Sequence, residues 1–376
     1  MKYIKGLDTL RAFAVFLVII THWGPRTFKS PVITFIFTRL IPDGKFGVDL
    51  FFVLSGYLIT KILLNARNEA LPDERLRIIK SFYIRRALRI FPIYFLLILF
   101  VAFILNDQFV KEHILYFFTY TSNFLVFKLN YWTQISHTWS LAVEEQFYII
   151  WPWLIIFSPR KYLLSLILTA LAIGVLSTII LESQYGEFAA VLLLPCITAF
   201  SIGALYAYVQ LNPRFKKTVT VTYLVLLPAC LVLLFVFQMG NKIILIRLVN
   251  SIIAINAIIY VVKENYGLIA KAIFSNRFLV NIGKISYGVY LYHYILPGFY
   301  DSAVNFLIRT FHLNGKLSRF LTFPPWSYLF LYAILFLISY LSYRFIETAF
   351  LRLKKKFSYL TIKKTHNPAT SANVPD

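Results

Sequence analysis

The stretch GLDTLRAFAVFLVIITHWG, residues 6–24, is apolar enough to cross a membrane, yet it carries Arg11 near its start and His22 near its end. On an α-helix eleven residues turn through about 1100°, three full turns plus about 20°, so both side chains lie on nearly the same face. They are about 16 Å apart along the axis, roughly half the thickness of the hydrocarbon core. The predicted helix therefore holds a fixed cation near one membrane surface and a titratable ring deep inside or near the other.

The whole chain is as apolar as this first stretch. Of its 376 residues, 59% are hydrophobic and 14% are charged, and the mean hydropathy is +0.71. Soluble domains have an apolar share of about 45–50%. Long apolar stretches recur from end to end, so the sequence predicts an all-α, polytopic integral membrane protein. The charges inside the first stretch, with no small-residue cleavage pattern after it, argue against a removable signal peptide.

The apolar stretches predict about ten transmembrane helices, at 7–24, 46–64, 89–106, 142–158, 162–181, 188–209, 218–238, 243–262, 281–300 and 326–346. About 27 of the 38 Lys and Arg residues fall on the side that holds the N-terminus, which predicts that both termini are cytoplasmic. The apolar segment 114–128 is short, and a crossing there would reverse every later helix against this pattern. It is predicted to be a re-entrant or interfacial segment on the outer side.

The net charge of +22 does not indicate a nucleic-acid partner, because the basic residues gather in alternate loops as membrane topology requires. The two cysteines, Cys196 and Cys230, lie in separate apolar runs, so we expect neither a disulfide nor a metal site. Residues 1–350 are expected to form one integral membrane domain. Residues 351–376 are expected to form a cytoplasmic tail, first basic, then polar and disordered.

Two charged groups in the first two helices have two interpretations each. Arg11 either reaches the cytoplasmic headgroups or faces inward, where Asp8 three positions earlier would pair with it. Asp49 enters the second helix early, in GKFGVDLFFVLSGYLIT, residues 44–60. It either favours the helix dipole as a half-solvated start of the helix or orients the ring of His22 on the outer side.

A basic cluster stands in KSFYIRRALRIFPIYF, residues 80–95. Arg85, Arg86 and Arg89 are expected at the cytoplasmic mouth of the third helix, where Pro92 limits how the helix continues. The cluster either contacts anionic lipid or binds a phosphorylated donor, because guanidinium groups bind phosphate through two parallel hydrogen bonds.

Two adjacent carboxylates, Glu144 and Glu145, stand in SHTWSLAVEEQFYIIWPW, residues 136–153. Ser140, Glu144 and Tyr148 share one helix face, with Trp139 just before them. Helix capping explains one glutamate, whereas a polar pocket for a hydroxyl-rich ligand explains the whole pattern.

A last candidate is His293, in the aromatic stretch ISYGVYLYHYIL, residues 285–296, where an interfacial aromatic belt is the ordinary interpretation.

Together these stretches resemble the acyltransferase-3 family of integral membrane acyltransferases, which O-acylate bacterial surface sugars. The family's first helix carries an Arg or Lys, then ten residues, then His, as Arg11 and His22 do here. Its other motifs match GVDLFFVLSGYLI at 47–59, RALR from Arg86 to Arg89, WSLAVEEQFY at 139–148 and SYGVYLYH at 286–293. The resemblance covers nearly the whole chain and implies a fold of ten helices with a re-entrant outer segment.

The resemblance implies an O-acyltransferase of the bacterial inner (cytoplasmic) membrane. Its donor would be cytoplasmic acyl-CoA, a co-substrate and no permanently bound cofactor. Its acceptor would be a hydroxyl of a carbohydrate such as O-antigen, capsule or exopolysaccharide. Membrane lipid would be a further partner, and a homo-oligomer stays open. Some members carry a further hydrolase-like domain, so we expect this chain to work without one or with a separate partner. The competing class is a secondary transporter or flippase.

The resemblance also implies roles for the candidate residues. His22 would act as a general base or as a covalent relay. The expected catalytic residues are His22, Glu144, Glu145 and Asp49. The expected donor-binding residues are Arg11, Arg85, Arg86 and Arg89. The expected carbohydrate-binding residues are Trp139, Ser140, Tyr148 and His293.

Overall fold

A computed structural model describes residues 3–23, 34–35, 39–239, 244–312 and 315–357. The described residues form helices and contain no strand, so the predicted all-α class is confirmed. The ten longest α-helices are α1 (Lys5–Trp23), α3 (Gly44–Glu69), α4 (Arg75–Leu99), α8 (Thr138–Phe157), α9 (Leu163–Tyr185), α10 (Leu193–Leu211), α11 (Pro213–Gln238), α12 (Ile246–Lys263), α14 (Arg277–Tyr292) and α17 (Pro324–Ser342).

Shorter elements connect these helices. The short α-helices are α5 (Gln108–Glu112), α6 (Ile114–Phe118), α7 (Ser122–Leu129), α13 (Leu268–Phe274), α15 (Leu296–Thr310), α16 (Lys316–Thr322) and α18 (Thr348–Leu353). The 3-10 turns are η2 (Pro72–Glu74), η4 (Arg160–Tyr162), η5 (Glu187–Val191) and η7 (Lys354–Lys356), and the π-helical turns are η3 (Phe100–Ile104) and η6 (Tyr343–Glu347). α6 and α7, which cover most of the predicted re-entrant segment, are both too short to cross a membrane.

Eight helical stretches of the described chain are long and apolar enough to span a membrane, which confirms a polytopic membrane protein. They contain α1, α3, α4, α9, α10, α11, α12 and α17. The other two predicted spans correspond to α8 and α14, and α14 has only 16 residues. The total of ten crossings and the cytoplasmic side of the termini stay predictions.

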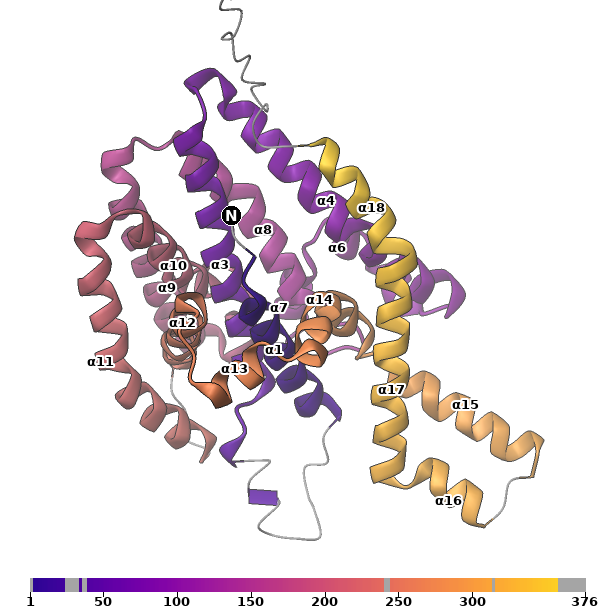
Figure 1. The fold of residues 1–376 in the computed structure, drawn as a ribbon. Helices are drawn as coiled ribbons and strands as arrows, with labels where there is room; N and C mark the ends of the chain where they lie inside the picture. Colours follow the sequence, from indigo (N-terminus) through magenta and orange to yellow (C-terminus); the bar gives the residue numbers. More distant parts are fainter. Residues whose placement is uncertain (1–2, 24–33, 36–38, 240–243, 313–314, 358–376) are drawn as a thin grey trace, which may run out of the picture.

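Helix α1 lies in the middle of the bundle and packs against α3 and α14 (Figure 1). The face of α3 that points away from α1 packs against α10, so closely that glycine is required on both α3 and α10. A Cβ on Gly56 would lie 2.0 Å from the carbonyl oxygen of Phe200, and one on Gly203 would lie 2.1 Å from that of Val53. The two backbones therefore contact each other directly, with no side chain between them, as is common between membrane helices that have small residues at their interface.

The predicted span 281–300 is wrong as one continuous helix. Helix α14 ends at Tyr292, and α15 begins at Leu296 with a proline in its first turn. Proline has no N–H to donate, so it suits the start of a helix and disfavours its middle. Helices α15 and α16 then extend away from the bundle beside the N-terminal end of α17 (Figure 1).

Two other boundaries differ from those expected. Helix α4 begins at Arg75, well before the expected residue 89, and runs through Pro92. At the C-terminal end, α18 and the turn η7 continue to Lys356, so residues 351–356 of the expected tail are helical. Residues 358–376, the rest of that tail, lie outside the described residues.

Candidate functional site

A cavity of about 610 Å³, whose lining includes several charged side chains, lies among α1, α3, α4, α8 and α14. Small-molecule sites typically measure about 300–1,000 Å³. Tyr3, at the start of the described chain, and Lys354, near its end, both line this cavity. The two ends of the described chain therefore meet at one site, as expected if both termini lie on the same side of the membrane.

One part of the cavity is strongly cationic. Arg86 and Arg89 line it from α4, on the shared face that their i,i+3 spacing predicts, and Arg11 lines it from α1. Asp8 accepts a hydrogen bond from Arg11 Nη1 at 2.5 Å, which confirms the pairing expected for an inward-facing arginine. Because Asp8 neutralises only one of these cations, the cavity favours an anionic ligand.

Arg85 lines the same cavity, but unlike Arg86 and Arg89 it is hydrogen-bonded to backbone carbonyl groups near the end of the described chain. Its Nη1 donates to the carbonyl oxygens of Lys354 at 3.3 Å and Phe357 at 3.0 Å, so it ties the segment after the last span to α4. The helix does not begin at these arginines. It begins at Arg75, ten residues before Arg85, and continues past Pro92 without a break. The arginines therefore lie inside α4, and their place at the cytoplasmic mouth of the membrane span stays a prediction.

Lys354 follows the last candidate span and adds a further cation to the cavity. Burial, together with the positive charges of Arg89, Arg86 and Arg85, lowers the pKa of Lys354 to about 7. The charged form is disfavoured because neighbouring cations repel it and little water reaches it. A bound anion would favour the charged form again, so the protonation of this lysine should respond to anion binding.

The two adjacent glutamates face different surroundings. Glu144 lines the cavity and accepts a hydrogen bond from Ser55 Oγ at 2.8 Å. Glu145 is 8% exposed and faces away, where Tyr94 and Tyr120 interact with it electrostatically, and its Oε1 has no hydrogen-bond partner among the described residues. Consecutive helical residues point about 100° apart, and here Glu144 lines the cavity whereas Glu145 does not.

The shared helix face predicted for α8 is confirmed, because Ser140, Glu144 and Tyr148 all line the cavity. Tyr148 OH lies 3.1 Å from Ser55 Oγ, which therefore joins the glutamate and the tyrosine. Trp139 does not share this face. Its ring packs edge-on against that of Phe52, with 6.1 Å between the ring centres.

Three histidines gather beyond the cavity. His22 is exposed at the end of α1, and its Nδ1 lies 3.2 Å from Nε2 of His293. The ring of His137 lies 5.3 Å from that of His293. Neither His22 nor His293 lines the cavity, and His293 is fully buried. The expected direct contact of His293 with a carbohydrate is therefore corrected, since aromatic neighbours cover its ring.

A hydrogen-bonded layer separates the cavity from these histidines. Ser140 Oγ and Tyr290 OH lie 2.6 Å apart, and both donate to the carbonyl oxygen of His137, at 3.2 and 3.1 Å. Both side chains line the cavity and both are buried. Arg11 lines the cavity and His22 does not, so the cavity does not reach from one to the other in this conformation.

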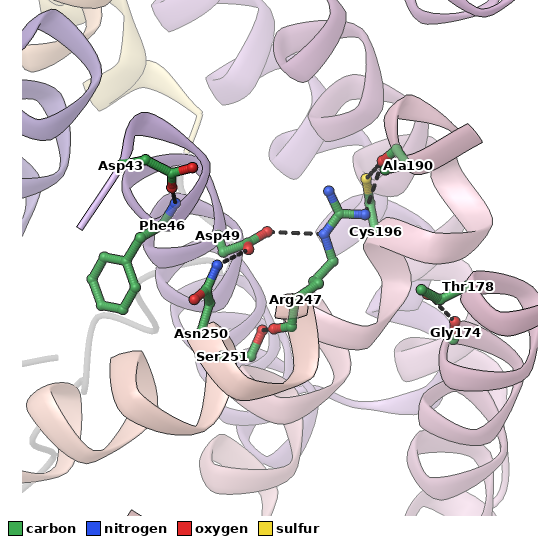
Figure 2. A network of polar contacts seen from close by, with 10 residues as sticks. All are labelled: Asp43, Phe46, Asp49, Gly174, Thr178, Ala190, Cys196, Arg247, Asn250 and Ser251. Atoms are coloured by element: carbon green, nitrogen blue, oxygen red, sulfur yellow. Dashed lines mark hydrogen bonds and ion pairs between the residues drawn. The ribbon is translucent and has the colours of Figure 1, made fainter. Parts of the chain in front are cut away.

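Asp49 does not orient His22. Its two carboxylate oxygens accept hydrogen bonds from Arg247 Nε and Asn250 Nδ2, each at 2.9 Å (Figure 2). Arg247 Nη1 also donates to the carbonyl oxygen of Ala190 at 2.9 Å. Asp49 is 2% exposed, so it is no half-solvated helix start either. Both interpretations from the sequence are corrected, because a cation on α12 holds this carboxylate.

The sequence analysis did not identify four residues of the site, namely Ser55, His137, Tyr290 and Lys354. Ser55 and His137 stand inside stretches that were singled out, but their partners lie on other helices. Tyr290 is three positions before His293, which places both at the same end of α14. No local pattern indicates Lys354, which appears as one of several lysines in a basic run.

Comparison with known proteins decides the family. Residues 4–344 match the model of a family described as "Acyltransferase domain". The chain belongs to this acyltransferase-3 family. It is 32% identical to "Putative O-acetyltransferase SACOL0978" of Staphylococcus aureus (strain COL), over 93% of this chain and 58% of that protein. It is 30% identical to "O-acetyltransferase OatA" of Staphylococcus aureus (strain MRSA252), over 97% of this chain and 60% of that protein.

The chain thus spans about six-tenths of the length of the curated relatives that it matches. No solved structure matches it significantly. The family membership agrees with the resemblance carried by the motifs. The matched residues cover α1 to α17, which include α1, α3, α4, α8 and α14 around the cavity.

Proposed function

We propose that this protein is a membrane O-acetyltransferase of the bacterial inner membrane. It moves an acetyl group from cytoplasmic acetyl-CoA to a hydroxyl of a cell-surface carbohydrate. The observation that carries the proposal is the cavity where Arg11, Arg86, Arg89 and Lys354 surround one space, in a chain of the acyltransferase family. Guanidinium and ammonium groups suit the phosphates of coenzyme A.

The transfer itself is assigned to His22. Its imidazole takes the proton of the acceptor hydroxyl while the oxygen attacks the thioester carbonyl, and the carbon–sulfur bond breaks. The proton then returns to the thiolate of coenzyme A. Imidazole suits both directions of this proton transfer, because one ring nitrogen can accept the proton and release it again. Because Ser140 and Tyr290 close the cavity toward His22, the donor's arm must displace this pair to reach the ring.

Glu144 is assigned to the reacting end of the donor or to the acceptor sugar. Its contacts to Ser55 and, through it, to Tyr148 form a line of hydroxyls and a carboxylate in the cavity wall. Such groups exchange hydrogen bonds with carbohydrate hydroxyls readily. The expected roles of Glu145 and Asp49 in catalysis receive no such support from their surroundings.

The test uses the purified full-length protein in lipid vesicles with acetyl-CoA and polysaccharide extracted from the cell surface. Release of the coenzyme A thiol and acetylation of the polysaccharide are measured together. We expect His22→Ala to abolish both, with normal protein yield, because no other group takes the proton. His113→Ala, which changes a half-buried histidine that does not line the cavity, is the matched control.

Two results would contradict the proposal. Near wild-type transfer by His22→Ala would remove the catalytic assignment. A wild-type protein that moves polysaccharide across the vesicle membrane without releasing thiol would indicate a flippase, the competing class.

A further inference from the structure

The hydrogen bonds around His22 and His293 determine where the ring protons lie. Nδ1 of His293 is 2.6 Å from the carbonyl oxygen of Tyr290, and Nδ1 of His22 is 2.9 Å from that of Val18. A carbonyl oxygen only accepts, so each of these nitrogens carries a hydrogen. The third contact, 3.2 Å between His293 Nε2 and His22 Nδ1, then needs an acceptor on His293.

Only one arrangement satisfies all three contacts. His293 is neutral, with its hydrogen on Nδ1 and a lone pair on Nε2. His22 Nδ1–H donates both to Val18 O and to that lone pair. In neutral His22 the hydrogen is therefore on Nδ1, which leaves the lone pair on Nε2 to act as the base.

The ring of His293 is held firmly in this orientation. It is fully buried, and the rings of His137 and Tyr294 lie 5.3 and 5.8 Å from it. Trp23 Nε1 donates to the carbonyl oxygen of His293 at 2.8 Å, which ties the end of α1 to the end of α14. A rotation of the ring would lose the short bond to Tyr290 O, so the lone pair on Nε2 stays directed at His22.

This role is one that a carboxylate often fills beside a catalytic histidine. Asp49 was the carboxylate expected from the sequence, but it is bound to Arg247 and Asn250. The acidic residues of the cavity, Asp8 and Glu144, are bound to Arg11 and Ser55. The group that faces His22 Nδ1 is therefore the neutral imidazole of His293.

We propose that His293 is the positioning residue of His22, an inference that rests on the proposed function and deepens it. When His22 Nε2 takes the proton of the acceptor hydroxyl, the ring becomes cationic, and its Nδ1–H bond to His293 becomes charge-assisted and stronger. The proton leaves again to the thiolate of coenzyme A, and His293 stays neutral throughout. His293 therefore acts on the transfer step without touching either substrate.

The experiment compares three substitutions of His293 for steady-state transfer from acetyl-CoA. His293→Phe keeps a flat ring and loses both nitrogens. His293→Gln keeps an acceptor near the place of Nε2, whereas His293→Asn keeps a polar group only near Nδ1. His113→Phe is the matched control, because His113 makes the same local bond, from Nδ1 to Phe109 O at 3.0 Å, and does not line the cavity.

We expect His293→Phe to lower kcat by about 10- to 100-fold, since a hydrogen bond to a charged group is worth about 1.5–3 kcal/mol. The KM for acetyl-CoA should stay within about twofold, because His293 does not line the cavity. His293→Gln should recover part of the lost rate and His293→Asn should not. A merely structural role would instead lower protein yield and coenzyme A binding for all three variants alike.

Two further outcomes overturn the inference. One is a kcat of His293→Phe within about twofold of the wild type. The other is a better recovery by His293→Asn than by His293→Gln, and this pair decides the question if the Phe variant does not fold. A wild-type protein without transfer activity would instead overturn the proposed function, and the inference with it, so the two failures are distinguishable.

Discussion

Asp49, in the first turns of α3, and Arg247, 198 positions later in α12, form a buried ion pair with 2.9 Å between Oδ1 and Nε. Both side chains are almost fully covered, at 3% and 11% exposed. The pair joins two helices that are distant in sequence, and Arg247 extends it to the backbone of Ala190 before α10 (Figure 2). The position of the pair indicates a role in holding the N-terminal ends of α3 and α12 together.

The first prediction follows from this pair. Asp49→Ala leaves the buried guanidinium of Arg247 without its counter-charge, which should destabilise the protein by about 3–5 kcal/mol. The double variant Asp49→Leu/Arg247→Met removes both charges and should regain most of that loss. Thermal unfolding in detergent measures both effects. An Asp49→Ala protein that unfolds at the wild-type temperature but has lost transfer would restore the catalytic role expected from the sequence.

The second prediction distinguishes the two glutamates. Glu144→Gln should lower transfer by at least about 100-fold if this carboxylate polarises a substrate hydroxyl, as general acid–base groups typically contribute that much. Glu145→Gln keeps the volume of a side chain that lies outside the cavity, so it should lower transfer far less. Transfer rates at equal protein amounts are the measurement. Equal losses in both variants would contradict the separation seen in the structure.

The third prediction separates phosphate binding from contact with lipid. The Arg86 guanidinium lies over the rings of Phe82 and Tyr148, at 5.6 and 5.2 Å from their centres, and lines the cavity. Arg86→Lys keeps the charge and loses the planar fork, so coenzyme A should bind about 10-fold more weakly. Arg77→Lys, an exposed change on the same helix, is the control. Unchanged affinity in a coenzyme A titration would mean that Arg86 does not bind the donor and contributes only to the orientation of the helix in the membrane.

The fourth prediction concerns pH. Lys354, with its pKa lowered to about 7, is protonated below neutral pH and loses its charge above it. The affinity for coenzyme A should therefore fall as the pH rises from about 6 to 8, since the attraction to phosphate is lost. Lys354→Arg stays charged throughout this range and should flatten the dependence relative to the wild type.

The control for this pH experiment is Lys356→Arg, in the same turn η7 but exposed. The titration of coenzyme A's own phosphates is common to all three proteins and cancels in the comparison. Parallel curves for wild type and Lys354→Arg would show that Lys354 does not face the ligand.

The fifth prediction tests the close contact between α3 and α10. Gly203→Ala would place a Cβ 2.1 Å from the carbonyl oxygen of Val53, so one helix must shift, at a cost of about 1–3 kcal/mol. Gly298→Ala, in α15, meets no atom within 4 Å and should stabilise the protein by about 0.5–1 kcal/mol. Unfolding in denaturant gives both values. The same sign for both changes would contradict the packing.

Local periodicity explains which features could be predicted from the sequence. The membrane class follows from apolar runs alone, because backbone groups in lipid must bond within their own helix. The pairing of Asp8 with Arg11, the shared face of Arg86 and Arg89, and the face of Ser140, Glu144 and Tyr148 all depend on spacings of three or four residues. Those spacings keep their meaning on any straight helix.

The partners of the site were decided only by the tertiary structure. Asp49 binds Arg247, Arg85 holds the turn at Lys354, and His22 faces His293, and each pair joins residues about 200 or more positions apart. The break of the expected span 281–300 has the same origin, since it brings the end of α14 against Trp23. Such contacts depend on how whole helices cross and turn about their axes, and no spacing within one helix encodes that.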